Sequence, residues 1–215
     1  MRKHWIWIVV LMLVGVVGWA TWAISAGPVT SKLSAAELAK VKNGEVVLKN
    51  VIDPQTNKGY GSGFCLYHGT KDQFWKVIFD YEHYLDIYPR LKKVTVISRT
   101  SNKAVVDFQM DASLTTLNYT TINLLSADQT KLTWTTDMTR PHKYFKRNDG
   151  YWLLEEIGPG LIVAEYRVEV ELDLGILSNV VGKIVQSMSR DDLPDVMIST
   201  RKRMESGGTW KRPGR

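Results

Sequence analysis

Residues 71–97, KDQFWKVIFDYEHYLDIYPRLKKVTVI, carry the pattern that decides the fold of this chain. Apolar side chains recur at helical spacing from Phe74 to Tyr81, which predicts a short amphipathic helix. A tyrosine-rich turn follows, and Pro89 ends it because a proline cannot continue a helix. The residues after Pro89 alternate between two faces, as in a half-buried strand. The stretch therefore predicts two short helical segments that lead directly into a β-strand.

The first 26 residues form a separate unit. Residues 5–26 carry no charged side chain, and tryptophans stand near both ends of this run: Trp5, Trp7, Trp19 and Trp22. A helix of this length reaches about 33 Å, enough to cross a hydrocarbon core of roughly 30 Å. Tryptophans at both ends suit the two membrane interfaces. We expect an uncleaved signal anchor in the cytoplasmic membrane, with the domain on the periplasmic or extracytoplasmic side. A cleaved signal peptide and a secreted domain are the alternative.

The remainder of the chain has the length of one domain. Ser34 and Glu37 have the spacing of a capping box, which predicts a linker helix within residues 27–43. We place the domain at residues 44–206 and expect residues 207–215 to be a basic, disordered tail. Cys65 is the only cysteine, so an internal disulfide is excluded.

The net charge of +6 comes from the two ends of the chain. Residues 27–200 contain 20 basic and 21 acidic side chains, whereas residues 201–215 contain six basic side chains and one acidic one. A nucleic-acid-binding domain needs a basic face on its folded part. The charge distribution therefore argues against nucleic acid as a partner.

Strand-like runs dominate the middle of the chain. Short turns separate them, which is typical of an antiparallel meander. The predicted strands are residues 44–51, 60–68, 93–100, 103–112, 115–125, 130–138, 150–157 and 161–174. Gly59, Gly61 and Gly63 alternate along the second run and predict a close-packed or bent strand, since the helix and lysine of a phosphate loop are missing.

The hydrophobic period changes after the last strand. An apolar stripe from Leu177 to Met188 recurs at helical spacing and predicts a long C-terminal helix. Asp191 and Asp192 precede Leu193-Pro194, a cap-and-proline start for a second helical piece that runs to about Met204. We therefore expect this helix to be kinked or rebuilt between residues 190 and 194.

Two motifs resemble the START-like superfamily (SRPBCC), in particular its polyketide-cyclase and coenzyme-Q-binding branch. The first has the form W-x-x-(I/L)-x-D-(Y/F)-x-x-Y-x-x-x-x-P and consists of Trp75, Ile78, Asp80, Tyr81, Tyr84 and Pro89. The second, D-L-P-x-x-(M/L)-x-x-x-R, runs from Asp192 to Arg201. The resemblance covers residues 44–206. It implies an α+β helix-grip fold, in which a curved antiparallel sheet wraps around a long C-terminal helix and holds an apolar ligand between them.

Alternation along the strands sorts their side chains into two faces. We expect large inward residues from the first helix, the sheet and the closing helix to line a cavity, with Thr136 and Tyr166 orienting the ligand's head. The predicted ligand-binding residues are Trp75, Phe108, Trp134, Thr136, Trp152, Tyr166, Ile184 and Met188. The alternative is that these residues fill a dry core. On the last strand, the face that carries Glu165, Arg167, Glu169 and Glu171 is expected to be solvated.

Catalytic and metal-binding signatures do not occur in the sequence. The four histidines show no metal-ligand spacing, and we expect neither a metal nor a cofactor. Cys65 lies in a predicted strand without a nearby histidine and is expected to be a buried, inert thiol. Glu156 shares the inward face with Trp152, although a solvent-exposed position at the rim is the simpler interpretation.

The leading hypothesis is a non-enzymatic carrier or sensor of an apolar small molecule, of the lipid or isoprenoid-quinone type, tethered at the membrane. A cyclase/aromatase-like enzyme and a protein-binding scaffold with a collapsed pocket are the alternatives. The oligomeric state is left open. Residues 140–147, RPHKYFKR, are basic and aromatic, and we expect them to form a lid that faces the membrane; an ordinary solvated hairpin loop is the alternative. The residues of this loop that would touch the membrane are Lys143, Tyr144, Phe145, Lys146 and Arg147.

Overall fold

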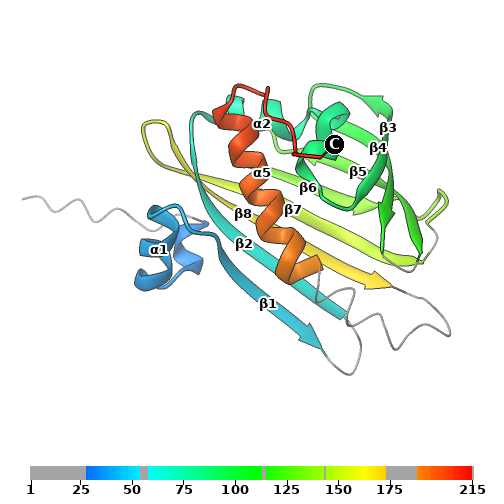
Figure 1. Cartoon of the computed structure of the whole chain (residues 1–215), viewed down its shortest axis with the longest axis horizontal. Coiled ribbons are helices and arrows are strands. Elements are labelled where there is room, and N and C mark those ends of the chain that lie inside the picture. The colour runs from blue at the N-terminus through cyan, green and yellow to red at the C-terminus, as the bar shows by residue number, and fades with distance from the viewer. Residues whose placement is uncertain (1–27, 54–57, 113–114, 143, 173–187, 215) are drawn as a thin grey trace, which may run out of the picture.

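The computed structural model describes residues 28–53, 58–112, 115–142, 144–172 and 188–214. Eight strands form one antiparallel sheet in the order β1-β2-β8-β7-β6-β5-β4-β3 (Figure 1). Their bounds are β1 Val47–Asp53, β2 Lys58–His68, β3 Leu91–Arg99, β4 Lys103–Asp111, β5 Thr116–Leu125, β6 Lys131–Thr136, β7 Phe145–Gly158 and β8 Leu161–Leu172. The strands from β3 to β8 each pair with the next along the chain, so the predicted meander is confirmed.

Short helices connect and cover this sheet. They are η1 Thr30–Lys32, α1 Ala35–Lys42, α2 Lys71–Ile78, η2 Tyr81–His83, α3 Tyr84–Ile87, the π-helical turn η4 Met188–Asp192, and α5 Leu193–Glu205. The predicted capping box of Ser34 and Glu37 opens α1, and a second box of Thr70 and Gln73 opens α2. From residue 71 the chain forms α2, then η2 with α3, and then β3, so the predicted order of two short helical segments and a strand is confirmed.

The curved sheet and the C-terminal helix α5 form the helix-grip arrangement, and Figure 1 shows α5 lying across one face of the sheet. We call this face the inner face and the opposite one the outer face. A Cβ atom added to Gly63 of β2 would lie 2.3 Å from both Leu193 Cδ2 and Met197 Sδ of α5. Gly63 therefore lets the helix approach the strand closely, as the alternating glycines predicted.

The inner face matches the predicted alternation. Val106, Phe108 and Met110 of β4 are buried, as are Trp152 and Leu154 of β7. They belong to one continuous core with α2, α3 and α5. The turn η4 meets α5 directly at residue 193, which is where the sequence predicted a rebuilt helix. Asp192 makes no side-chain capping bond to α5, contrary to its predicted role, because its carboxylate contacts Arg90 instead.

The outer face differs from its prediction at Glu165, which is only 2% exposed although we expected it to be solvated. The N-terminal segment causes this burial, because Val29 and Val41 pack on the outer face against Phe64 and Val163. The described residues 28–43 are therefore a packed part of the fold and more than a linker.

Two glutamates hold the N-terminal segment in place. Glu155 accepts hydrogen bonds from the backbone N–H groups of Val29 at 2.9 Å and Thr30 at 2.7 Å. Glu165 pairs with Lys32 Nζ at 2.5 Å and accepts a hydrogen bond from Ser62 Oγ at 3.1 Å. Because the pairing satisfies the buried carboxylate, Glu165 is tolerated on a covered face.

The C-terminal tail also departs from its prediction. Its described residues, 207–214, fold back against the rest of the domain, and Arg212 makes hydrogen bonds to Asp86, Ile87, Asp195 and Ser199. The expectation of a disordered tail rested on its basic composition. The Asp195 carboxylate pairs with the guanidinium of Arg212, and the Asp86 carboxylate accepts a hydrogen bond from its backbone N–H.

The predicted membrane span, residues 5–26, lies outside the described residues. Within the described part of the chain, no helix is both long and apolar enough to cross a bilayer.

Candidate functional site

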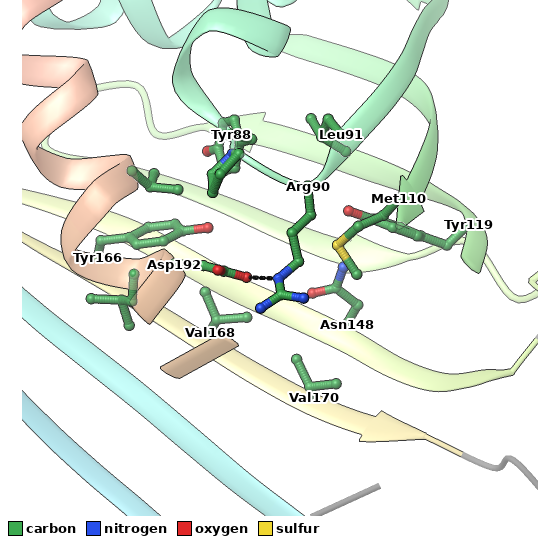
Figure 2. A pocket seen from close by; sticks show the side chains of 13 residues that line it. Tyr88, Arg90, Leu91, Met110, Tyr119, Asn148, Tyr166, Val168, Val170 and Asp192 are labelled. Carbon is green, nitrogen blue, oxygen red and sulfur yellow. Dashed lines mark hydrogen bonds and ion pairs between the residues drawn. The ribbon is translucent and has the colours of Figure 1, made fainter. Parts of the chain in front are cut away.

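Two adjoining cavities lie between the inner face of the sheet, the segment from α3 to β3, and the start of α5. The outer cavity has a volume of about 90 Å³ and the inner cavity one of about 60 Å³. Both are bordered by Tyr88, Leu91, Tyr119, Asn148 and Tyr166, so they form one continuous site. Figure 2 shows the outer cavity, where side chains from α3–β3, the sheet and η4 converge.

Aromatic rings form the floor of the inner cavity. The ring of Trp152 stacks on that of Tyr166 with a centroid distance of 4.3 Å, and Trp134 lies 5.5 Å from the same tyrosine. Phe108 approaches from β4 and stacks on Tyr119 at 5.3 Å. These rings present flat apolar surfaces to the cavity, which suits a planar or aliphatic ligand.

Tyrosine hydroxyl groups project into this aromatic site. Burial raises the pKa of Tyr88 to about 12, although its interactions with Tyr166, Trp152 and Tyr84 partly oppose the shift. Burial also holds the pKa values of Tyr84, Tyr119 and Tyr166 above the ordinary range. All four hydroxyls are therefore neutral at physiological pH. The hydroxyl of Tyr84 already donates to the carbonyl of Ile78 at 2.5 Å, whereas those of Tyr88, Tyr119 and Tyr166 remain the candidates for a bond to a ligand.

Amide side chains supply the remaining polar groups of the inner cavity. Asn148 lies on β7 and its side chain interacts with the hydroxyl of Tyr119. Asn123 Nδ2 donates a hydrogen bond to Thr121 Oγ1 at 2.8 Å. Among the described residues that line the inner cavity, none has a charged side chain. The cavity can thus satisfy a neutral oxygen-bearing group, whereas a charged group would lack a counter-charge.

Charged side chains line the outer cavity alone, and among the described lining residues they are Arg90 and Asp192. Arg90 Nε contacts Asp192 Oδ2, and about a fifth of each side chain is exposed (Figure 2). Burial raises the pKa of Asp192, and the neighbouring Arg90 opposes that shift. Arg90 precedes β3 and Asp192 precedes α5, so this pair joins the two segments that flank the outer cavity.

The structure brings together four of the predicted ligand-binding residues, since Phe108, Trp134, Trp152 and Tyr166 all line the inner cavity. Trp75 does not line either cavity; it is buried, and its Nε1 donates to the carbonyl of Gln129 at 2.8 Å.

Three further predicted positions do not contribute a described side chain to the site. Thr136 Oγ1 accepts a hydrogen bond from Asn148 N at 2.7 Å and also contacts Asp149, so it closes the junction of β6 and β7. Ile184 lies outside the described residues, and for Met188 only the backbone, in η4, is described. Glu156 is exposed and pairs with Lys71 at 3.4 Å, in agreement with the rim interpretation.

Sequence reasoning missed much of the lining. Tyr84 and Tyr88 belong to the fold-deciding stretch, but their segment has no regular period that would point them inward. Tyr119 and Asn148 alternate correctly with inward residues of β5 and β7. Asn148 was overlooked because the predicted strand began at Gly150, whereas β7 begins at Phe145 and Asn148 pairs with Val170.

The basic loop predicted for residues 140–147 is shorter than expected. Of the predicted membrane-facing residues, Phe145, Lys146 and Arg147 belong to β7. Tyr144 lies in the connection between β6 and β7, and Lys143 is outside the described residues. Arg147 pairs with Asp149 at 2.9 Å and with Glu169 at 3.1 Å. The loop sequence has no acidic side chain, but carboxylates of β7 itself and of the neighbouring β8 pair with Arg147.

Cys65 is fully buried, and burial raises the pKa of its thiol to about 11, which agrees with the expected inert cysteine. In the described part of the chain, no three histidine, cysteine, aspartate or glutamate side chains are grouped so that they could hold a metal ion.

Residues 70–196 match the sequence profile described as polyketide cyclase / dehydrase and lipid transport. The chain belongs to this family. The match spans α2 to the first residues of α5 and thus all elements that border the two cavities. No curated protein sequence matches the chain.

Solved structures share the fold at low sequence identity. The Zhui aromatase/cyclase from Streptomyces sp. R1128 is 14% identical, with a TM-score of 0.56 over 75% of this chain and 99% of its own. A STAR-related lipid transfer protein from Xanthomonas axonopodis is 11% identical, with a TM-score of 0.60 over 74% and 93%. Human STARD10 is 15% identical, with a TM-score of 0.60 over 75% and 69%. These similarities establish the START-like fold of the family member.

Proposed function

We propose that this protein binds a small apolar molecule with a neutral, oxygen-bearing head, and that it carries or senses this molecule without transforming it. The observation that carries the proposal is the lining of the inner cavity: aromatic rings with tyrosine hydroxyls and amides, and no charged side chain among the described residues. The ligand's head would bond to Tyr88, Tyr119 or Asn148, and its apolar part would extend along Met110, Val168 and Val170 of the outer cavity.

Electrostatics favours a neutral head over an ionised one. Moving a carboxylate or phosphate into an apolar site is costly unless a counter-charge is present. The nearest cation among the described lining residues is Arg90 in the outer cavity, and it already contacts Asp192. The tyrosine hydroxyls, kept neutral by their raised pKa values, can donate to a hydroxyl or carbonyl oxygen without such a cost.

The second candidate function is that of a cyclase-like enzyme, which the family description includes. Such an enzyme needs an acid or base that can reach the reacting atoms. Asp192 is the single carboxylate among the described lining residues, and it lies in the outer cavity in an ion pair with Arg90. This placement favours binding over catalysis, and product analysis after incubation with candidate polyketide substrates would reverse that preference if it detected turnover.

We also propose that residues 5–26 tether the domain to the membrane, on its outer side. Val29, three residues after this predicted span, is docked on Glu155 near the end of β7, whereas the predicted membrane-facing loop precedes the start of that strand. At about 3.3 Å per strand residue, the ten residues between positions 145 and 155 correspond to about 33 Å. Val29 and this loop therefore lie near opposite ends of β7. A membrane role for Tyr144 and its neighbours stays a prediction, which vesicle binding of charge-neutralised variants would test.

The test of ligand class uses two probes of one shape. Full-length protein in a mild detergent is titrated calorimetrically with 2-naphthol, which is neutral at pH 7, and with 2-naphthoate, which is anionic. We expect 2-naphthol to bind at least about tenfold more tightly, because the carboxylate would be desolvated without a partner. Equal binding, or tighter binding of 2-naphthoate, would contradict the neutral-head proposal.

A matched pair of variants assigns the binding to the inner cavity. Asn148→Leu removes an amide from the cavity, and Asn118→Leu makes the same change on β5, where Asn118 bonds to Gln109 Nε2 at 3.3 Å. We expect only Asn148→Leu to weaken 2-naphthol binding, by about tenfold for one lost hydrogen bond of about 1–1.5 kcal/mol. A similar loss in both variants would place the bound probe elsewhere.

A further inference from the structure

The C-terminal tail, residues 207–214, is built to turn back on the domain. Gly207 and Gly208 follow α5 with φ values of +65° and +90°, a conformation that favours glycine. Gly207 N donates to the carbonyl of Met204 at 3.0 Å and Gly208 N to that of Arg203 at 2.7 Å. This pair of bonds is a Schellman motif, which ends the helix and reverses the chain toward α3.

The guanidinium of Arg212 bridges two segments that are far apart in the sequence. On one side, Nη2 donates to the carbonyl of Ile87 at 2.8 Å and Nε to that of Asp86 at 3.1 Å. On the other side, Nη1 pairs with Asp195 Oδ2 at 2.8 Å and Nη2 donates to Ser199 Oγ at 3.0 Å. Arg212 therefore fastens α3 to α5, and only 18% of its side chain is exposed.

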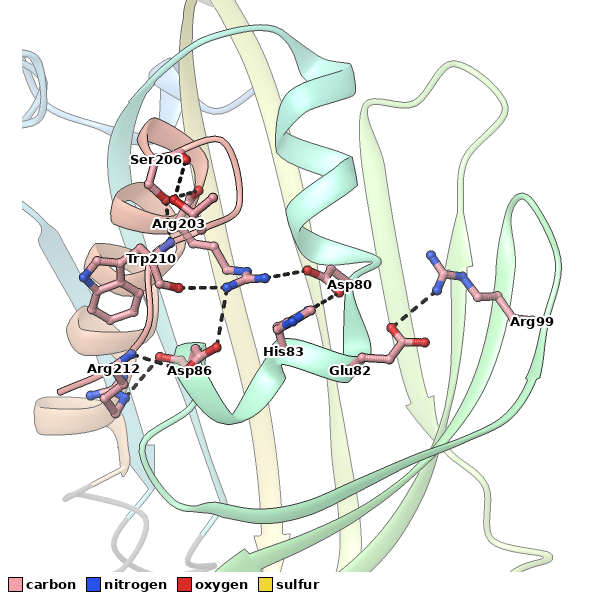
Figure 3. Close-up of polar contacts among 10 residues, drawn as sticks. Asp80, Glu82, His83, Asp86, Arg99, Arg203, Ser206, Trp210 and Arg212 are labelled. Carbon is pink, nitrogen blue, oxygen red and sulfur yellow. Dashed lines mark hydrogen bonds and ion pairs between the residues drawn. The ribbon is translucent and has the colours of Figure 1, made fainter. Parts of the chain in front are cut away.

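Arg203 of α5 supports the same arrangement (Figure 3). Its Nη2 pairs with Asp80 at 2.8 Å, and its Nη1 donates to the carbonyl of Trp210 at 2.8 Å and lies 3.4 Å from Asp86. Trp210 N in turn donates to Ser206 Oγ at 2.8 Å. The tail is thus fixed at two residues, Trp210 and Arg212.

The segments that Arg212 joins are the two walls of the outer cavity. Tyr88, Arg90 and Leu91 follow Ile87 on one wall, and Leu193 and Val196 flank Asp195 on the other. The cavities of about 90 and 60 Å³ are smaller than the roughly 300–1,000 Å³ usual for sites that enclose a ligand. A ligand must therefore part these walls to enter or leave.

We infer that the C-terminal tail is a clasp that holds the α3 and α5 walls together and sets the rate at which ligand exchanges. The inference rests on the proposed binding function and adds its regulation. The clasp acts on the barrier to opening, since the Arg212 contacts are broken when the walls separate and are restored when they close. For a probe small enough to be enclosed with the walls closed, it therefore changes the association and dissociation rates together and leaves the equilibrium affinity nearly unchanged.

The test compares Arg212→Ala with Lys211→Ala in the full-length protein in a mild detergent. Both changes remove one positive charge from the tail, but Lys211 is exposed. Stopped-flow energy transfer from the cavity tryptophans to 2-naphthol gives both rates. For Arg212→Ala we expect both rates to rise about tenfold, which corresponds to about 1.4 kcal/mol, with the dissociation constant unchanged. Lys211→Ala should match the wild type, and Arg212→Lys should fall between them.

A second measurement works without any ligand. Tyr88 N donates to the carbonyl of Tyr84 at 2.8 Å, and Leu91 N to that of Tyr88 at 3.3 Å, so hydrogen exchange of these amides reports on opening of the α3 wall. The clasp predicts faster exchange at residues 84–91 in Arg212→Ala and unchanged exchange in Lys211→Ala.

The two measurements separate the possible failures. If 2-naphthol binds neither wild type nor variant while exchange at residues 84–91 rises, the proposed binding function fails and the clasp stands. If exchange and ligand rates in Arg212→Ala equal those of Lys211→Ala, the clasp is overturned and the binding function stands. A loss of affinity with unchanged rates of opening would also overturn the clasp, because it would make Arg212 part of the binding surface.

Discussion

Replacement of Arg203 by methionine should cost this domain more stability than replacement of any exposed cation. Only 2% of the Arg203 side chain is exposed, and it lies against Asp80, Asp86 and the carbonyl of Trp210 (Figure 3). Methionine keeps the apolar stem but leaves both carboxylates without this cation. Breaking a buried ion pair by removing one partner costs about 3–5 kcal/mol. Asp80 is 28% exposed and can be partly hydrated, so we expect a loss near 3 kcal/mol.

Urea unfolding of the full-length protein in a mild detergent, followed by circular dichroism, measures this loss. Lys202→Met is the control, because Lys202 is exposed and lies 5.6 Å above the Trp210 ring, a contact worth at most about 1 kcal/mol. The double variant Arg203→Met/Asp80→Asn should recover part of the loss, since it removes one of the unpaired carboxylates. A loss below about 1 kcal/mol for Arg203→Met would refute the reasoning.

The pH dependence of the same variant gives an independent check. Burial opposes ionisation of Asp80, but hydrogen bonds from His83 and Arg203 outweigh it, so its pKa lies below the ordinary value. A lowered folded-state pKa contributes stability above the unfolded pKa of about 3.9 and loses it as pH falls further. The stability gap between wild type and Arg203→Met should therefore narrow below about pH 4.

Three further outcomes follow from the packing and the ionisation of the domain. Gly63→Ala should destabilise the fold by about 1–3 kcal/mol in thermal unfolding, because the new Cβ would lie 2.3 Å from Leu193 and Met197. The control Gly158→Ala should not destabilise it, since the nearest neighbour of that Cβ would be 3.7 Å away. Equal effects of the two changes would contradict the close approach of α5. The free energy of unfolding should fall as pH rises above about 10, because tyrosines of the unfolded chain ionise there while burial raises the folded pKa of Tyr88 to about 12. A stability profile that is flat between pH 10 and 12 would argue that these hydroxyls are hydrated. Glu155 accepts bonds from the N–H groups of Val29 and Thr30, so Glu155→Gln should speed hydrogen exchange of these two amides by about tenfold or more, because it weakens charge-assisted bonds. Unchanged exchange would show that the apolar contacts alone hold the segment.

The sheet could be predicted because its signal is local. Strand alternation places Val106, Phe108 and Met110 on one face whatever lies beyond the strand, and all three are buried together. The capping boxes at Ser34 and Thr70 are likewise formed by residues three apart. The sequence predicted the aromatic residues that the sheet strands β4, β6, β7 and β8 contribute to the cavity, including Trp134 and Trp152, for the same reason.

The rest of the site depends on contacts between distant segments. Residues 147–149, Arg-Asn-Asp, have the composition of a turn, but pairing with β8 extends β7 through them and turns Asn148 inward. Glu165 reads as solvated until the N-terminal segment covers it. Arg90 and Asp192 are 102 positions apart, and no pattern in the sequence shows that they meet.

Native mass spectrometry of the full-length protein, purified in a mild detergent from cells that express it naturally, tests the central claim most directly. The wild type is compared with Val168→Phe, which narrows the outer cavity at a half-buried position. Binding of a neutral amphiphile predicts a bound mass on the wild type that extraction identifies as an uncharged, oxygen-bearing molecule, and a much weaker adduct on the variant. A bare protein mass, a charged phospholipid as the adduct, or an equal adduct on both proteins would contradict the account.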